Sequence, residues 1–187
     1  ERYRLESLLN SNCNIGAMTP RNFASLWAPV IKRETFAVKT HYPPGRVVRI
    51  LSAMGFVRAC FIFRDPRDIV VSILDHGEAL RREGKSEVVF FHIHTAQEAA
   101  HFVASRMGVW DGWTGLPGRL VMRYEDLVGD PLRSARSLAE FLGVPASDHD
   151  LQGILACYAG DRARVDQSLH FNVGVVGRYR EALGSSD

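Results

Sequence analysis

The stretch FIFRDPRDIVVS, residues 61–72, joins an apolar strand to the first turn of a helix. Residues 57–63 are almost all apolar, which is typical of a strand covered on both faces of a parallel sheet. Asp65 fits the N-cap of the next helix, and Pro66 fits the first helical position, where the missing N–H costs nothing. Asp68 lies three residues beyond the cap, in the favourable field of the free N–H groups. The stretch therefore predicts a strand that leads directly into a helix.

The start of this helix is a candidate anion site. Its free N–H groups lie at the carboxyl end of a parallel strand, where open α/β sheets bind ligands. Arg64 adds a guanidinium group, and Ser72, seven residues after Asp65, lies about two turns along the same side of the helix. A phosphate could meet both Arg64 and the Ser72 hydroxyl. Taken alone, these residues also fit a capped helix with ordinary surface ion pairs.

The composition is that of a globular chain. Its 187 residues, 46% hydrophobic and 24% charged, predict a single domain over residues 1–187. The net charge of +2 does not indicate a nucleic-acid partner, and no apolar run is long enough to span a membrane. The three cysteines are widely spaced, which favours a reducing compartment, so we expect a cytoplasmic protein. The oligomeric state is not readable from these patterns.

Strands and helices alternate along the chain, which predicts an α/β fold with a parallel sheet and right-handed crossovers. The segment at 88–94 fits a strand, a lid or the start of a helix. The chain begins inside a helical pattern with no start signal, so we expect the natural protein to extend upstream. Helices are predicted at residues 1–12, 21–31, 46–54, 66–82, 95–113, 130–142, 146–158 and 178–183, and strands at 35–39, 57–63 and 119–124.

Lys39 and His41 follow the end of a predicted strand, which assigns them to the same sheet edge as Arg64. His41 can act as a general base near neutral pH, and the stiff turn Tyr42-Pro43-Pro44-Gly45 would hold its backbone in place. Lys39, two residues earlier in an extended segment, points the same way as His41. The alternative is a surface histidine beside a solvated lysine.

A metal site is not indicated. His92 and His94 have a spacing that could ligate a metal, but further ligands at a credible spacing are absent. The cysteines have no basic neighbours that would activate a thiol. We therefore expect neither a metal cofactor nor a thiol nucleophile.

Three motifs together resemble the sulfotransferases that use 3′-phosphoadenosine 5′-phosphosulfate (PAPS). The motifs are Lys39-Thr40-His41, Arg64-Asp65-Pro66-Arg67-Asp68 with Ser72, and Arg123-Tyr124-Glu125-Asp126-Leu127 followed by Asp130-Pro131. The resemblance implies a three-layer, P-loop-kinase-like fold. It also implies that Arg64 and Ser72 bind the 3′-phosphate, that Tyr124 lies by the adenine, and that His41 removes the acceptor proton with Lys39 near the transferring group.

The tail from Gly174 to Arg180 is similar to the final nucleotide-binding loop of that family, which implies cofactor contacts from Gly174, Gly177 and Arg178. Asn172 and Val173 stand where the family has arginine and lysine, so Arg178 or Arg180 would have to supply the charge. The family's first motif, a phosphate loop of the Pro-Lys-Ser-Gly-Thr-Thr-Trp type, is not in this sequence. We expect it upstream of Glu1; the alternative is a chain that has lost the loop and cannot catalyse.

The resemblance implies in-line sulfuryl transfer from PAPS to a hydroxyl, or less often an amine, of a small-molecule or carrier-linked acceptor. Two alternatives remain open. One is a phosphotransferase on the related P-loop fold, which would need a Walker-type loop and a magnesium-binding aspartate. The other is a nucleotide-binding or scaffold protein that kept only the 3′-phosphate site. The sequence does not identify the acceptor.

Overall fold

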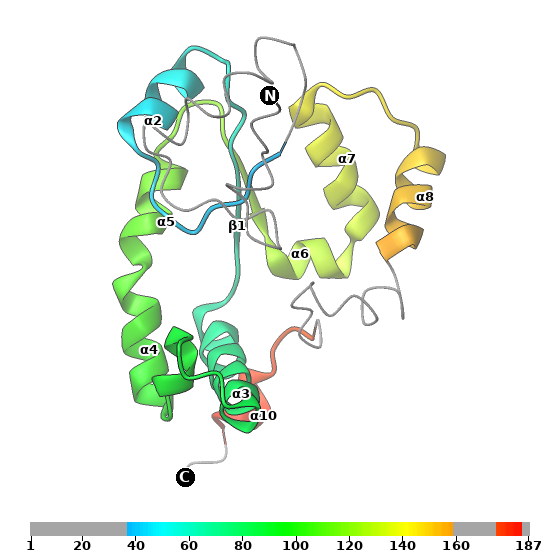
Figure 1. The fold of residues 1–187 in the computed structure, drawn as a ribbon. Helices are drawn as coiled ribbons and strands as arrows, with labels where there is room; N and C mark the ends of the chain where they lie inside the picture. The colour runs from blue at the N-terminus through cyan, green and yellow to red at the C-terminus, as the bar shows by residue number, and fades with distance from the viewer. Residues whose placement is uncertain (1–36, 159–174, 185–187) are drawn as a thin grey trace, which may run out of the picture. The chain divides into compact units, whose positions relative to one another are not determined.

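The computed structural model describes residues 37–158 and 175–184, drawn as coloured ribbon in Figure 1. The chain divides into two compact units, and each is described by itself. Among the described residues, unit 1 comprises residues 37–61, 108–120 and 158. Unit 2 comprises residues 62–107, 121–157 and 175–184. The single domain expected over the whole chain stays a prediction, and the helices predicted at 1–12 and 21–31 lie outside the described residues.

The described elements combine helices with a parallel sheet, as the sequence predicted, but several helices in a row separate the two strands. The two strands pair in a parallel sheet, and each leads into a helix. No helix among the described residues is both long and apolar enough to cross a membrane. In chain order the elements are α2 (Arg46–Ala53), β1 (Cys60–Phe63), α3 (Pro66–Glu83), η2 (Val89–His92), α4 (Ala96–Ser105), α5 (Met107–Thr114), β2 (Leu120–Arg123), α6 (Tyr124–Gly129), α7 (Pro131–Leu142), α8 (Asp148–Tyr158) and α10 (Tyr179–Ala182).

The strand predicted at 57–63 is shorter and more exposed than expected. β1 covers only Cys60–Phe63, and Ile62 is 52% exposed. The described residues place β1 beside β2 in a two-stranded sheet. Full burial on both faces is therefore wrong for this strand. Of the strand predicted at 35–39, residues 35 and 36 lie outside the described part, and Lys39 forms an isolated bridge.

Most predicted helices are confirmed, with one correction. The helix predicted over 95–113 is two helices, because α4 ends at Ser105 and α5 starts at Met107. At the break, the Arg106 N–H bonds to the Val103 carbonyl, three residues back rather than four, which tightens the last turn. The ambiguous segment at 88–94 contains the 3-10 helix η2. The short helix α6 was not predicted.

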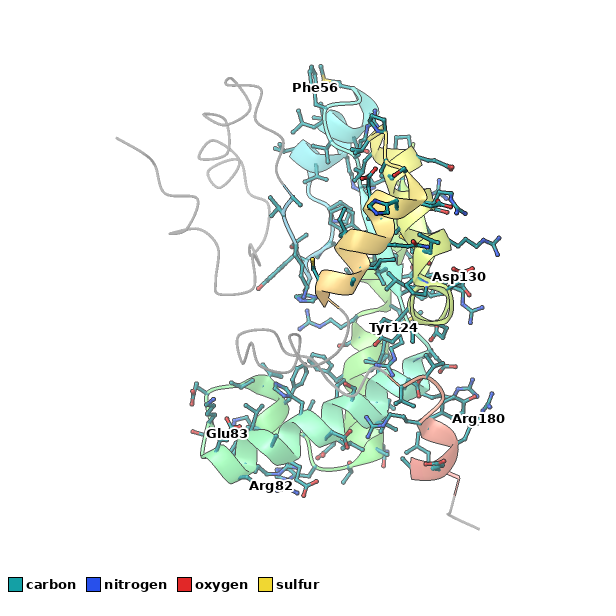
Figure 2. All side chains as sticks on the ribbon, turned by 90° about the vertical axis from the view of Figure 1, so that its right-hand side faces the viewer. Phe56, Arg82, Glu83, Tyr124, Asp130 and Arg180 are labelled. Atoms are coloured by element: carbon teal, nitrogen blue, oxygen red, sulfur yellow. The ribbon has the colours of Figure 1, made fainter. Side chains whose placement is uncertain are left out.

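Unit 1 has its own small core. Val48 of α2, Ala59 and Leu116 are buried together, and Trp113 packs against them. The Trp113 indole N–H donates to the Tyr42 carbonyl oxygen at 2.9 Å, which ties the turn after His41 to this core. Phe56, labelled in Figure 2 beyond the end of α2, is 70% exposed.

Unit 2 is organised around α3. Its buried face carries Val70 and Ile73, which form a core with Ile93 and Ala99. α4, η2 and α10 pack against α3, and α7 packs against α6. Arg82 and Glu83 mark the C-terminal end of α3 in Figure 2. The opposite end of α3 carries the candidate site.

Candidate functional site

The start of α3 forms as the sequence predicted. Asp65 is the N-cap, Pro66 occupies the first helical position, and the Asp65 carboxylate accepts the Arg67 backbone N–H at 2.9 Å. The Arg67 side chain also bonds this carboxylate, at 3.0 and 2.6 Å, and this is the main reason that the pKa of Asp65 is lowered. The Arg67 backbone N–H therefore already has an acceptor. An incoming anion would have to rely on side chains more than the sequence suggested.

A second carboxylate reaches the same turn from α6. Glu125 Oε1 accepts the Asp65 backbone N–H at 2.8 Å, which links the segments after β1 and β2. Glu125 Oε2 is buried and accepts no hydrogen bond, and it lies 3.7 Å from Arg123 Nε. Sequence reasoning read Glu125 only as part of a motif and missed this link.

Arg64 lies at the centre of the site. Its guanidinium carbon is 4.6 Å from the centroid of the Tyr124 ring, a cation–π arrangement. Arg64 Nη2 donates to the Val175 carbonyl oxygen at 2.8 Å and lies 3.4 Å from Asp68 Oδ2. The side chain is only 18% exposed, and its Nε is a buried donor with no hydrogen-bond partner. Because an unsatisfied buried donor is costly, Nε is a point at which an acceptor on a ligand would be stabilised.

Asp68 lies in the first turn of α3, as the sequence predicted, but its contacts with the C-terminal segment, defined here as Val175–Leu183, were not predicted. It is 1% exposed. Its Oδ2 accepts the Gly177 N–H at 2.7 Å, and its Oδ1 accepts the Tyr179 N–H at 3.2 Å. Burial alone would raise the pKa of Asp68, but these two donors and the Arg64 guanidinium outweigh it and lower the pKa. An aspartate at the third position of a helix is an ordinary feature, so the sequence does not indicate its contacts with the C-terminal segment.

The C-terminal segment is held against α3. Arg178 Nη2 donates to Asp75 Oδ2 at 2.6 Å, and the Arg67 guanidinium lies 3.8 Å from the centroid of the Tyr179 ring. Gly177 has a backbone φ of +80°, which residues other than glycine rarely adopt. Of the predicted tail residues, Gly177 and Arg178 thus meet α3, whereas Gly174 lies outside the described residues.

The other predicted residues fall into two groups. Ser72 is half-buried on α3, in the same unit as Arg64 and Tyr124. Figure 2 labels Tyr124 at the start of α6. Lys39 and His41 are exposed and belong to unit 1. The structure therefore places Arg64, Ser72 and Tyr124 in one unit, and the binding and catalytic roles of all these residues stay predictions. Among the described residues, no cluster of histidine, cysteine and carboxylate groups could hold a metal ion.

The model of the sulfotransferase domain family matches residues 33–169. Among solved structures, the chain is similar to retinol dehydratase in complex with androsterone and the inactive cofactor PAP, with a TM-score of 0.55 and 20% identity. That match covers 85% of this chain and 51% of retinol dehydratase, so the chain spans about half the length of that protein and shares its fold. No curated protein matches the sequence.

Proposed function

The chain belongs to the sulfotransferase domain family, whose model matches residues 33–169, and from this premise we propose that it transfers the sulfuryl group of PAPS to an acceptor. The acceptor group is a hydroxyl, or an amine, on a small molecule or a carrier. The observation that carries the proposal is the Arg64 guanidinium, which is mostly buried beside Tyr124 and keeps an unpartnered Nε. The solved relative that binds PAP supports the same nucleotide.

In this proposal, the 3′-phosphate binds between Arg64 and Ser72. Arg64 supplies the charge and its free Nε–H, and Ser72 supplies a hydroxyl from the same helix. The Tyr124 ring, already in contact with Arg64, offers an aromatic surface beside the adenine. Gly174, Gly177 and Arg178 of the tail complete the nucleotide site. The fold proposed around it is three-layered and P-loop-kinase-like.

The proposed reaction is an in-line displacement at sulfur. The acceptor oxygen attacks the sulfur atom as His41 takes the hydroxyl proton, and a new O–S bond forms. The bond between sulfur and the 5′-phosphate oxygen breaks, and its electron pair stays on that oxygen, which releases PAP. Lys39 lies near the transferring group and stabilises the charge that develops on its oxygens. No protein-bound intermediate is needed.

Two variants separate catalysis from nucleotide binding. We expect His41→Ala to reduce turnover at least about 100-fold, the usual contribution of a general base, while the Kd for PAP changes little. We expect Arg64→Ala to raise the Kd for PAP about tenfold or more, because a buried charge-assisted contact is lost. His149→Ala, an exposed histidine on α8, is the matched control.

Turnover is measured as PAP release from PAPS against panels of alcohols, phenols, sugars and acyl carriers, and affinity by calorimetry. Near-normal turnover of His41→Ala would remove His41 from the mechanism. If the wild-type protein binds PAP but transfers no sulfuryl group to any acceptor, the non-catalytic nucleotide-binding alternative is favoured. If it binds no PAP, the proposed function is wrong.

A further inference from the structure

One side of α3 carries the residues that hold the C-terminal segment. Asp68, Ser72 and Asp75 follow the spacing i, i+4, i+7, which places them on one face of a helix. Asp68 binds the backbone N–H groups of Gly177 and Tyr179, and Asp75 binds the Arg178 side chain. The C-terminal segment therefore lies along the helix face that also bears Ser72.

Arg64 also contacts the C-terminal segment. Its Nη2 meets both Asp68 Oδ2 and the Val175 carbonyl oxygen, at 3.4 and 2.8 Å. Asp68 thus contacts both Arg64 and the backbone of the C-terminal segment. With 1% of its surface exposed, Asp68 has little room to move.

We propose that Asp68 is a positioning residue, which fixes the guanidinium of Arg64 and the C-terminal segment in one arrangement and so sets the preference for a 3′-phosphorylated nucleotide. This inference rests on the proposed function, because it takes the Arg64–Ser72 site as the 3′-phosphate site. Asp68 itself does not touch the nucleotide, because its two oxygens are engaged by Gly177, Tyr179 and Arg64.

The arrangement explains why a carboxylate stands so close to a proposed anion site. The Asp68 charge would weaken phosphate binding if it faced the ligand. Instead, Gly177 and Tyr179 donate to it, and Arg64 keeps its Nε unpartnered. Asp68 therefore orients Arg64 while its own charge is satisfied by the tail, and the free donor of Arg64 is left for the ligand.

The test compares two nucleotides that differ only in the 3′-phosphate. In Asp68→Asn the amide keeps one acceptor oxygen, but its NH₂ group must face a donor N–H, and the charge opposite Arg64 is lost. We expect the ratio of Kd values for 5′-AMP and adenosine 3′,5′-bisphosphate to fall about tenfold, with the Kd for 5′-AMP unchanged. Glu78→Gln makes the same chemical change elsewhere on α3, where Glu78 pairs with Arg82, and should leave the ratio intact.

A second measurement uses the wild-type protein and does not depend on the variant folding. If Asp68 links Arg64 to the C-terminal segment, then binding of a 3′-phosphate at Arg64 also makes the C-terminal segment more ordered, because the two effects are reciprocally coupled. Adenosine 3′,5′-bisphosphate should then slow hydrogen exchange at the Gly177 and Tyr179 amides several-fold more than 5′-AMP does at equal saturation.

The outcomes separate the two proposals. A wild-type protein that does not distinguish the two nucleotides would overturn the 3′-phosphate site, and this inference with it. A wild-type protein that distinguishes them, combined with an unchanged ratio in Asp68→Asn or with equal exchange under both nucleotides, overturns only the role of Asp68. An equal loss of affinity for both nucleotides in Asp68→Asn would show a merely structural role and would also overturn it.

Discussion

At the scale of single residues, the site depends on pairs of opposite charge. Arg64 pairs with Asp68, and Arg67 pairs with Asp65. The Arg67 pair is exposed, so it contributes little free energy of folding and mainly completes the N-cap of α3. In the Arg64 pair the Asp68 side chain is fully buried and the Arg64 side chain largely so, and removing either partner would leave an uncompensated charge. Asp68 is therefore the residue whose charge state matters most here.

The contacts of Asp68 lead us to expect that the C-terminal segment is held less firmly in acid. Its pKa is lowered in the folded protein, so its contribution to stability is fully present above the ordinary pKa of about 3.9 and is lost as the pH falls through the folded value. Three positive charges lie near Asp68. They belong to Arg64, which precedes α3, to Arg67 on α3, and to Arg180 on α10, which Figure 2 labels. All three favour the ionised form.

The measurement is the free energy of unfolding in urea between pH 6 and pH 2. We expect the wild type to lose stability below about pH 4, and the loss to be smaller in Asp68→Asn, which has no carboxylate to titrate. Glu78→Gln serves as the control. Identical pH profiles for the wild type and Asp68→Asn would show that Asp68 contributes nothing to the acid sensitivity.

At the scale of elements, α3 is defined at both ends by local chemistry. Asp65 and Pro66 start it, and Gly84, with φ +69°, ends it. The local sequence pattern does not show how closely the backbone at residues 90–93 approaches α3. A Cβ added at Gly77 would lie 2.5 Å from the Phe90 carbonyl oxygen and 3.2 Å from that of Ile93. Gly77 therefore allows η2 and the segment after it to lie against the helix.

Gly77→Ala should accordingly destabilise the protein by about 1–3 kcal/mol, because the backbone at Phe90 must move. Gly153→Ala on α8 is the matched control. Nothing lies within 4 Å of a Cβ built there, so the better helix propensity of alanine should stabilise by up to about 1 kcal/mol. Both values come from urea unfolding. A neutral Gly77→Ala would mean that η2 does not approach α3 as described.

At the scale of the whole molecule, the described residues form two hydrophobic cores, one in each unit. Val48, Ala59 and Leu116 form the core of unit 1, and the cluster around Val70 and Ile73 forms that of unit 2. Leu116 is 1% exposed and comes from the turn between α5 and β2, far in sequence from Val48. The core of unit 1 therefore depends on contacts between distant parts of the chain.

Leu116→Ala should cost about 2–5 kcal/mol of the free energy of unfolding, because it leaves a cavity in this small core. Ile50→Ala on α2, where the isoleucine is 59% exposed, should change stability by no more than about 0.5 kcal/mol. Chemical denaturation measures both. Equal effects of the two substitutions would show that Leu116 is not part of a packed core.

The sequence by itself determined the local features and the family resemblance. Asp65 and Pro66 predicted the start of α3, and Thr95 with Glu98 predicted the capping box of α4, because such signals act within a few residues. It also brought Arg64, Ser72 and Tyr124 together in one hypothesis through their motifs. The prediction of a strand at 57–63 that is covered on both faces is wrong, because an apolar run does not show which elements pack on the strand.

Only the tertiary structure decided which groups meet across long sequence separations. The contact of Asp68 with Gly177 joins residues 109 positions apart, and that of Arg64 with Val175 joins residues 111 positions apart. No periodicity reaches that far along a chain. Whether a buried carboxylate is satisfied depends on the donors that folding brings to it, and local propensity carries no information about donors from the other end of the chain.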